Sequence, residues 1–484
     1  MVEQNRLEKL QKLRDMGINP YPYVYDQTHH AKEIKEQYAE LEGKEVSVAG
    51  RILGEREMGK IHFYDLLDST EKIQIMIRTG VANEQSIRLL KLLDVGDIIG
   101  VKGKVTKTKK GEISVDAAEL VLLAKSLRTL PEKFHGLKDT DIRYRKRYLD
   151  LIVNPETRRV FRTRTRIIDY IRNFLNERGF LEVETPILQP VYGGATAKPF
   201  KTHHNYLDVD MYLRIADELY LKRLIIGGLE RVYEFSRDFR NEDVDSEHNP
   251  EFTMLEFYQA YGDYNTFMQL TEQLLSGLVK ELYGTYEIEY QGRKINFKPP
   301  FKRLYFVDEI KKGCGVDISE LTDDQAKELM RKESLATSIP NAYHVADALF
   351  DKYIKPQATD PTFVLDYPSY MCPLTKDKRG NSRLSERFEL FVDGKELANT
   401  YSELTDPIEQ RRKFEEQDAE RRKGDPEAPP SDEDFLEAIE YGMPPTAGIG
   451  IGIDRLVMVL TNSPSIKEVI LFPTVKPIGK EETP

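Results

Sequence analysis

The sequence predicts an α+β protein with a small N-terminal β-barrel and a larger domain built on an antiparallel sheet flanked by helices. Closely spaced alternating strand patterns fill residues 45–124, as in a small Greek-key barrel. Beyond residue 155, long connections separate the strand patterns, which favours an antiparallel sheet over a regular βαβ series. The chain has 484 residues, enough for roughly two to four domains.

Residues 1–43 are expected to form a helical segment, because Leu7, Leu10 and Leu13 are spaced three apart before Gly17. Residues 44–126 contain five short strands and one helical stretch near residues 83–93. The strand sequences are VSVAGRI, KIHFYDLL, KIQIMIR, DIIGVKGKV and ISVDAAELVLL. This pattern predicts a five-stranded barrel of the OB type. Such barrels bind many ligands, so the barrel alone assigns no function.

Residues 127–154 are rich in charge and aromatic side chains and include Pro131, which predicts a linker. The second domain, residues 155–484, begins with an amphipathic helix that ends near Gly179. Its expected strands contain MYLRI, RVYEFSRDF, EFTMLEFYQAY, RFELFV and AGIGIGI. A helical insertion is expected at about residues 302–360, and a polar helical stretch interrupted by a loop at residues 409–440.

Composition excludes several classes of protein. With 40% hydrophobic and 32% charged residues, the chain is neither a disordered polymer nor a membrane bundle. Cys314 and Cys372 are too few for a disulfide framework or a thiolate zinc site. No apolar run approaches the roughly 20 residues that span a bilayer, and we expect a cytoplasmic protein without membrane contact. The net charge of −11 argues against a protein that coats nucleic acid, although residues 41–130 carry 15 basic and 13 acidic residues, a net +2.

A predicted hairpin joins RVYEFSRDFR (231–240) to PEFTMLEFYQAY (250–261). Alternation places four residues of its second strand on one face: Phe252, Met254, Glu256 and Tyr258. Together with Arg240 and the loop residue His248, these side chains suit a bound nucleotide, because a guanidinium binds phosphate and a ring stacks on a base. The alternative is a charged sheet edge with ordinary cross-strand pairs.

The segment TAGIGIGIDR (446–455) lacks side chains at Gly448, Gly450 and Gly452. A backbone or a planar ligand can approach closely there. Arg455 begins an apolar helix and is placed to meet a phosphate. The alternative is tight helix packing against the glycines.

A second hairpin is expected in RFELFVDGKELANTYSEL (387–404). If Asp393-Gly394 forms a two-residue turn, Glu389 pairs with Ala398 and becomes a diagonal neighbour of Glu396. Two such carboxylates suit Mg²⁺ on a polyphosphate, although exposed glutamates are usually only solvated. Three further residues alternate on the other face unless a bulge near Leu397 re-aims them: Asn399, Tyr401 and Glu403.

Together these segments resemble the signature motifs of class II aminoacyl-tRNA synthetases, and of lysyl-tRNA synthetases in particular. GFLEVETPILQP (179–190) resembles the first motif, which builds the dimer interface in that family. FRNE (239–242) followed by HNPEFT (248–253) resembles the second motif, and GIGIDR (450–455) the third. The resemblance extends to the barrel and the linker. It implies a homodimer that activates L-lysine with ATP, uses Mg²⁺, and transfers lysine to the 3′ end of tRNA(Lys).

The resemblance also implies roles for residues that would bind ATP. Arg240 would neutralise the α-phosphate, and Arg455 and His248 would hold the outer phosphates; the two arginines are the expected catalytic residues. Phe252 would stack on adenine, with Glu242 and Asn249 fixing the base. Glu389 and Glu396 fall at the family's metal-binding positions, and Glu389 is also expected to contact ATP.

In the resembling enzymes, the positions of Glu218 and Glu403 receive the lysine side-chain ammonium, beside Tyr258. The positions of Gly194 and Glu256 meet the α-amine, and Asn399 meets the carboxylate; Tyr401 is expected in the same pocket. A desolvated ammonium needs carboxylate partners, whereas a pocket for aspartate would need Arg or Lys. A basic group between Glu218 and Glu403 would therefore contradict this assignment. The alternative is that Glu218 is a helix-surface acid.

For tRNA, the barrel residues Arg56, Phe63 and Gln74 match positions that recognise the central anticodon uridine in this class. On residue type alone, Phe63 fits the barrel core slightly better. Three other functions remain open: an aspartyl- or asparaginyl-specific relative, a catalytically silent relative that binds tRNA or a partner, and a lysine ligase that acts on a protein.

Overall fold

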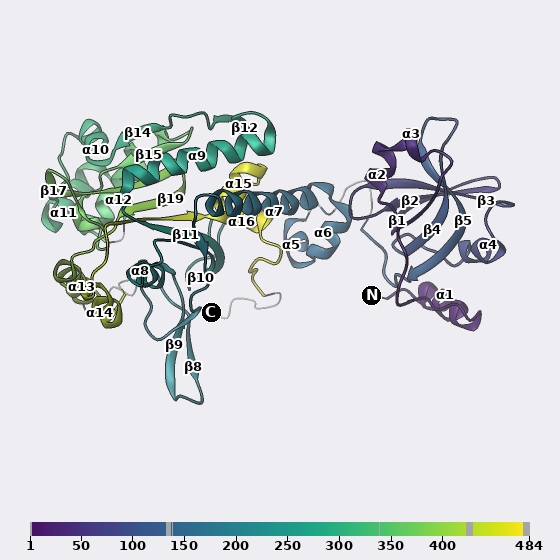
Figure 1. Ribbon diagram of the computed structural model, residues 1–484, viewed down its shortest axis with the longest axis horizontal. Helices are drawn as coiled ribbons and strands as arrows, with labels where there is room; N and C mark the ends of the chain where they lie inside the picture. The colour runs from purple at the N-terminus through teal and green to yellow at the C-terminus, as the bar shows by residue number, and fades with distance from the viewer. Residues whose placement is uncertain (1, 132–136, 138, 338, 423–428, 478–484) are drawn as a thin grey trace. The chain divides into compact units, whose positions relative to one another are not determined.

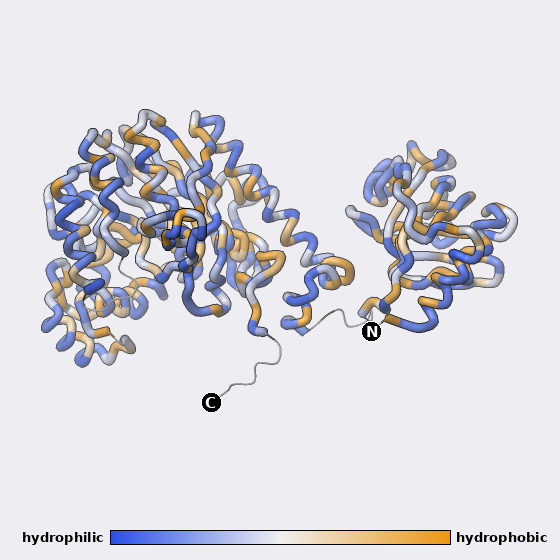
Figure 2. The backbone as a smooth tube through the Cα atoms, turned by 90° about the horizontal axis from the view of Figure 1, so that it is seen from below, coloured by the Kyte–Doolittle hydropathy of each residue, from blue (hydrophilic) through white to orange (hydrophobic). Residues whose placement is uncertain are grey.

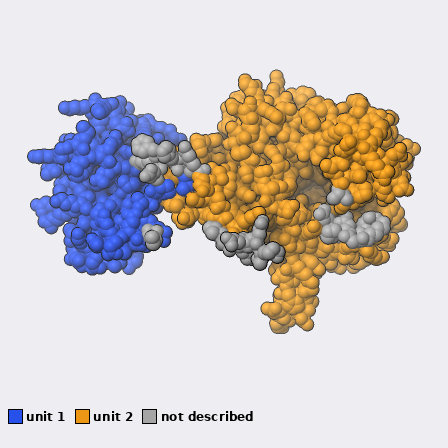
Figure 3. All heavy atoms as spheres, turned by 180° about the vertical axis from the view of Figure 1, so that it is seen from behind, with its two compact units in different colours: residues 1–137 blue, residues 138–484 orange. Residues whose placement is uncertain are grey.

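The computed structural model describes residues 2–131, 137, 139–337, 339–422 and 429–477. The chain forms two compact units, residues 1–137 and 138–484, which Figure 3 colours blue and orange. Parts of the expected linker (132–136 and 138) and of the loop in the polar helical stretch (424–428) lie outside the described residues.

Unit 1 is the expected barrel with short helices (Figure 1). Its strands close in the order β1-β2-β3-β5-β4, which confirms the five-stranded prediction. They are β1 (Glu45–Met58), β2 (Ile61–Leu67), β3 (Lys72–Arg78), β4 (Ile98–Lys107) and β5 (Ile113–Ala124). The helices are α1 (Gln4–Asp15), α2 (Ala31–Glu36), α3 (Tyr38–Leu41) and α4 (Glu84–Leu90). Alternate strand residues such as Tyr64, Leu66 and Ile75 fill the interior.

Unit 2 is built on an eight-stranded sheet. Its strands, in spatial order, are β14 (Lys302–Tyr305), β15 (Thr362–Leu365), β18 (Arg387–Val392), β19 (Lys395–Ser402), β20 (Thr446–Gly452), β11 (Glu251–Ala260), β10 (Arg231–Phe239) and β6 (Leu181–Glu182). The six strands from β15 to β10 pair antiparallel, as expected, whereas the edge strands β14 and β6 pair parallel to their neighbours. The sheet is therefore mixed, with an antiparallel centre.

The two faces of this sheet differ in chemistry. Apolar residues of one face, including Leu255, Phe257 and Ile449, pack against α7 (Pro155–Asn176), α9 (Tyr264–Tyr283) and α15 (Ile453–Thr461) in one hydrophobic core. Residues that alternate with them on β11, among them Glu256 and Tyr258, lie on the opposite face. The apolar face stabilises the sheet by packing against the helices, and the candidate site lies on the polar face.

Smaller elements complete unit 2. The first three residues of the expected strand MYLRI belong to β9 (Val209–Leu213), which pairs with β7 (Leu188–Gln189) and β8 (Lys201–His204) in a separate sheet. Strands β8 and β9 project from the body of the unit in Figure 1. Two further small sheets are β12 (Glu287–Tyr290) with β13 (Arg293–Asn296), and β16 (Asp377–Lys378) with β17 (Asn381–Ser385). The other helices are α8 (Glu218–Ile226), α13 (Pro407–Arg422), α14 (Glu433–Glu440) and α16 (Ile466–Val469).

The expected insertion near residues 302–360 is helical. It contains α10 (Phe306–Cys314), α11 (Asp323–Glu333) and α12 (Ala342–Tyr353). The expected linker differs from a plain loop, because it contains α5 (Thr140–Arg145) and α6 (Arg147–Val153). The buried Arg147 guanidinium fastens α6 to the end of unit 2 by donating to the carbonyls of Lys467 at 2.6 Å and Leu471 at 3.0 Å.

Among the described helices, none is long and apolar enough to cross a membrane. Figure 2 shows apolar and polar segments alternating at short intervals along both units. This pattern is typical of elements that bury one face.

Candidate active site

A β-bulge brings the acids of the β18–β19 hairpin onto the polar face of the sheet. Phe391 pairs with Glu396, but the register then shifts, so that Leu390 pairs with Ala398 and Glu389 with Asn399. Leu397 is the extra residue. The expected pairing of Glu389 with Ala398 is wrong, whereas the bulge that a single pocket requires is confirmed.

The glycine strand β20 makes room for side chains of its neighbours. A Cβ at Gly448 would lie 2.1 Å from Tyr258 Cε1 and 2.6 Å from Glu403 Oε1, which no side chain tolerates. Gly450 lies between Glu256 and Asn399 in one row across three strands. The missing side chains therefore open this face over the pocket, and the alternative of helix packing against Gly448 does not apply.

Glu218 and Glu403 converge on one atom, the Nζ of Lys222. Glu218 Oε1 lies 2.5 Å from this ammonium, and Glu403 forms a second ion pair with it. All three side chains are buried, so the alternative of Glu218 as a helix-surface acid is wrong. The expectation that no basic group lies between the two glutamates is also wrong, so these two residues by themselves no longer assign lysine as the substrate. The physical reason is that two desolvated carboxylates need a cation, and Lys222 lies one helical turn after Glu218.

The charge balance around Lys222 depends on whether Glu403 is protonated. Burial raises the pKa of Glu403 from 4.5 to about 8, with Lys222 opposing and Glu218 adding to the rise. Two carboxylates against one ammonium leave one negative charge when both acids are ionised. A second ammonium would neutralise it, whereas an anionic side chain would be repelled.

The remaining predicted lysine-pocket residues line the same face. Tyr258 donates its hydroxyl hydrogen to Glu256 at 2.8 Å, and Asn399 donates to the Tyr401 hydroxyl at 2.9 Å. Gly194 has a φ of +84°, and a Cβ there would lie 3.1 Å from the Glu218 Cβ. The structure thus brings these residues together with Glu218 and Glu403.

The predicted nucleotide residues form a second group. The Arg240 guanidinium lies 5.1 Å from the centre of the Phe252 ring, and its buried Nε has no hydrogen-bond partner in the described part of the chain. Arg455 Nη2 lies 3.3 Å from His248 Nε2. These are two cationic ends beside an aromatic face, which suits a nucleotide with its phosphates.

Glu242 and Asn249 differ in how free they are to meet a base. Glu242 is exposed and accepts a hydrogen bond from the Lys198 amide at 3.2 Å. The buried Asn249 donates to the Glu251 carbonyl at 2.6 Å and accepts from the Thr474 amide at 3.1 Å. The geometry favours Asn249 less than Glu242 as a residue that binds the base, because the oxygen and the nitrogen of its side-chain amide both already make hydrogen bonds to backbone groups.

Glu389 and Glu396 lie close enough to repel one another. Burial raises the Glu389 pKa to about 7, with Arg387 opposing and Glu396 adding to the rise. Glu389 accepts from the Tyr367 hydroxyl at 2.7 Å and pairs with Arg387. Glu396 is partly exposed, with Oε2 3.4 Å from Arg455. Two hard carboxylate ligands that face one another fit Mg²⁺, although each also pairs with an arginine.

The predicted anticodon residues share the outer surface of the barrel. Arg56 pairs with Phe63 across β1 and β2, and Gln74 pairs with Asp65 across β2 and β3. The interior is filled by Tyr64 and Leu66, so Phe63 faces outward and is half-buried. Residue type alone slightly favoured Phe63 as part of the barrel core. This interpretation is wrong, because side chains alternate along β2 and the inward positions belong to Tyr64 and Leu66.

Comparisons with known proteins agree with this architecture. Residues 139–476 match the family described as tRNA synthetases class II (D, K and N), and residues 46–123 match the OB-fold nucleic acid binding domain. The chain belongs to the class II tRNA synthetases. Proteins named lysine–tRNA ligase are similar over nearly the whole chain. That of Moorella thermoacetica is 54% identical over 481 residues, 99% of this chain and 98% of the relative. That of Thermoanaerobacter pseudethanolicus is 52% identical over 475 residues, which cover 98% of this chain and 95% of the relative. That of Clostridium novyi is 50% identical over 480 residues, which cover 98% of this chain and 94% of the relative.

The sequence reasoning missed several residues of this class II synthetase site. Lys222 follows Glu218 by four positions, and Arg387 precedes Glu389 by two, so helix and strand spacing gave a usable signal for both. Asp217 and Asp238 also lie in the site, beside Glu256. Asp217 directly precedes Glu218 and Asp238 lies two positions before Arg240, but their approach to Glu256 depends on three separate elements and follows from no local pattern.

Proposed function

We propose that this synthetase is a lysine–tRNA ligase, which activates L-lysine with ATP to lysyl-adenylate and transfers the lysyl group to the 3′ end of tRNA(Lys). The observation that carries the proposal is the similarity, at 50–54% identity over nearly the whole chain, to proteins named lysine–tRNA ligase. The convergence of two buried carboxylates, Glu218 and Glu403, on one cation position supports the same substrate.

In the first step, a lysine carboxylate oxygen attacks the α-phosphorus of ATP, and pyrophosphate leaves. The nucleophile is already ionised, so the step needs no general base. Arg240 would neutralise the α-phosphate from beside Phe252, which would stack on adenine. Arg455 and His248, which already contact one another, would hold the outer phosphates. The contribution of the protein is positioning and charge stabilisation.

Glu389 and Glu396 would hold Mg²⁺, and the repulsion between the two carboxylates, which adds to the rise in the Glu389 pKa, supports this role. When bound, the ion supplies positive charge to the phosphate oxygens. Arg387 would share Glu389 with it, because Arg387 pairs with that carboxylate.

In the second step, a ribose hydroxyl at the tRNA terminus takes the lysyl group, and AMP leaves. Arg56, Phe63 and Gln74 would read the anticodon from the outer barrel surface. A half-buried ring that faces outward can stack on an unpaired base, whereas the guanidinium and the amide can meet its edge.

The main alternative within the family is specificity for aspartate or asparagine. A pocket for aspartate needs an available cation, and Lys222 is basic. Both of its neighbouring carboxylates pair with it, so Lys222 is not a free cation for a substrate carboxylate. This favours lysine over an acidic substrate.

Homodimer formation and a cytoplasmic location remain predictions. Three residues of the segment that resembles the dimer motif are exposed and apolar, which supports a partner surface there: Leu181, Ile187 and Leu188. Sedimentation analysis of the purified protein tests the dimer.

Charging of purified tRNA(Lys) with labelled lysine tests the proposal as a whole. We expect ATP-dependent formation of lysyl-tRNA and release of AMP and pyrophosphate. Pyrophosphate exchange without transfer to any tRNA would favour the ligase that acts on a protein. Tight tRNA binding without turnover of ATP would favour the silent relative.

A further inference from the structure

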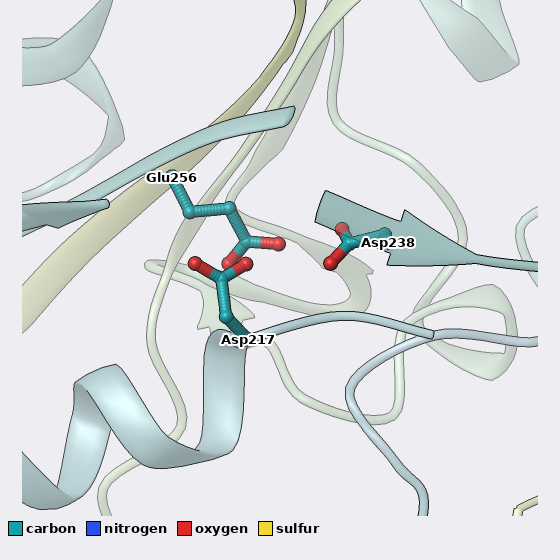
Figure 4. Close-up of side chains that lie close together, drawn as sticks. All are labelled: Asp217, Asp238 and Glu256. Atoms are coloured by element: carbon teal, nitrogen blue, oxygen red, sulfur yellow. The ribbon is translucent and has the colours of Figure 1, made fainter. Parts of the chain in front are cut away.

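Three acids that converge in the sheet's polar face extend the site beyond the residues discussed above. Ligand oxygens of Asp217, Asp238 and Glu256 all lie within 4.8 Å of one another. Figure 4 shows their carboxyl groups facing one another from the start of α8, from β10 and from β11. Their exposures are 0%, 1% and 6%.

Asp217 is not used by the helix that it precedes. It occupies the N-cap position of α8, where an aspartate ordinarily accepts a hydrogen bond from the first turn, but its side chain makes no capping bond. Neither carboxylate oxygen has a hydrogen-bond donor among the residues that the structure describes. A fully buried carboxyl group that turns toward two others, with no partner except a proton shared with Glu256, is suited to bind a cation that displaces that proton.

Both basic and acidic groups face this cluster. Arg214 lies 3.3 Å from Asp238, but its guanidinium also pairs with Glu234 at 2.7 Å. The other facing groups are Arg240 near Asp238, and Glu218 and Tyr258 near Glu256. Burial raises the pKa of Glu256 to about 8 and that of Asp238 to about 6, and it raises the pKa of Asp217 well above its ordinary value. In the absence of a cation, Glu256 therefore retains a proton near neutral pH, whereas Asp238 loses its proton at lower pH.

The cluster adjoins the proposed lysine pocket at two points. Glu256 accepts the hydroxyl hydrogen of Tyr258, which contributes to that pocket. Gly194 approaches the side chains on both sides of Asp217, because a Cβ at Gly194 would lie 3.1 Å from the Cβ atoms of Ala216 and Glu218. An ammonium has three N–H donors, which matches three carboxyl groups around one position.

We infer that Asp217 and Asp238 join Glu256 in binding the α-ammonium of the amino-acid substrate, and that binding expels the cluster's protons to solvent. This inference rests on the proposed function, because it takes an amino acid as the ligand. It separates two tasks. Glu218 and Glu403 recognise the side chain, and the cluster recognises the group that every amino acid carries.

Titration calorimetry with the full chain tests the inference, using L-lysine and 6-aminohexanoate, which lacks the α-amine. Repeating each titration in buffers of different ionisation enthalpy gives the number of protons released. For the unaltered protein, we expect L-lysine to release more protons than 6-aminohexanoate. Equal release would overturn the proton step.

Asp217→Asn and Asp238→Asn test the residues directly, with the exposed Asp208→Asn as the matched control. Each site variant should weaken L-lysine binding roughly tenfold or more, leave 6-aminohexanoate binding unchanged, and reduce proton release on lysine binding. Equal weakening of both ligands, or of neither, would overturn the assignment. Two separate substitutions guard against one that fails to fold.

A divalent cation is the competing occupant of three carboxyl groups. Titration of Mg²⁺ or Mn²⁺ alone, with binding lost in Asp217→Asn while lysine affinity stays unchanged, would replace the inference with a metal site. Failure of the proposed function is a separate outcome, because the unaltered protein would then not bind lysine. The same comparison would in that case use the amino acid that does support exchange and its analogue without the α-amine.

Discussion

Lys222 and Glu403 form an ion pair in which both side chains are completely buried. The pair joins α8 to the segment that follows β19, and Glu218 shares the same ammonium. An internal cation thus stabilises the pocket before any substrate arrives. It also leaves the pocket one positive charge short of neutrality when both glutamates are ionised.

Replacing Lys222 by Met should destabilise the lysine-free protein. Loss of one partner from a buried ion pair costs about 3–5 kcal/mol, and here it leaves two carboxylates unpaired. Added lysine should then raise the melting temperature more than in the unaltered protein, since its ammonium would take the vacated position. Thermal denaturation with and without lysine measures both effects. Lys332→Met on the exposed surface of α11 is the control. If Lys222→Met lowered the melting temperature no more than Lys332→Met does, the role of Lys222 would be contradicted.

Glu403→Gln tests recognition of the side-chain ammonium. The substitution keeps the shape of the side chain but removes a buried charge. Binding of the lysine transition state should therefore weaken by about 2–5 kcal/mol, which is measured as a lower kcat/KM for lysine in pyrophosphate exchange. The exposed Glu177→Gln serves as the control. A kcat/KM equal to that of the control would exclude Glu403 from lysine recognition.

Stability without lysine should fall as pH rises from about 5 to about 8. The folded-state pKa values of Glu403 and Glu256 are raised to about 8 and that of Asp238 to about 6. A raised carboxyl pKa stabilises the folded state fully below the unfolded value, and this stabilisation is lost as pH passes the folded value. Acids with lowered pKa values, such as Asp245 and Asp317 at about 2, act only at lower pH. Urea unfolding at several pH values in this range measures how the free energy of unfolding changes with pH. Bound lysine should make this free energy less dependent on pH. A free energy of unfolding that rises with pH would contradict the charge assignment.

Phe63→Ala tests the barrel surface. Removing the ring should impair charging of tRNA(Lys) while leaving pyrophosphate exchange intact, because stacking of a base on an aromatic ring contributes about 1–3 kcal/mol. Tyr23→Ala, which removes a 99% exposed ring from the same unit, controls for loss of any surface aromatic. Parallel loss in both assays would indicate misfolding instead of a tRNA contact.

Local patterns predicted much of this fold. Period-two alternation identified the barrel strands and the central strands of the large sheet, and the hairpin turn at Asp393-Gly394 led to the condition of a bulge at Leu397. The same alternation could have placed Phe63 outside, because Tyr64 and Leu66 occupy the interior. Residue type gave the wrong answer there because it ignores the direction of the side chain.

Other features depend on where distant side chains meet. The bridge from Lys222 to Glu403 joins residues 181 positions apart, as the numbering shows, and nothing in either segment specifies it. The cluster of Asp217, Asp238 and Glu256 arises from a helix start and two strands. Such contacts follow from tertiary packing, which local sequence patterns do not encode.

Amino-acid-dependent exchange of pyrophosphate into ATP, run with each of the twenty amino acids in turn, tests the central claim most directly. The pocket predicts exchange with L-lysine and none above background with aspartate or asparagine. Exchange with either of these, in the absence of exchange with lysine, would contradict the claim that Glu218 and Glu403 select an ammonium.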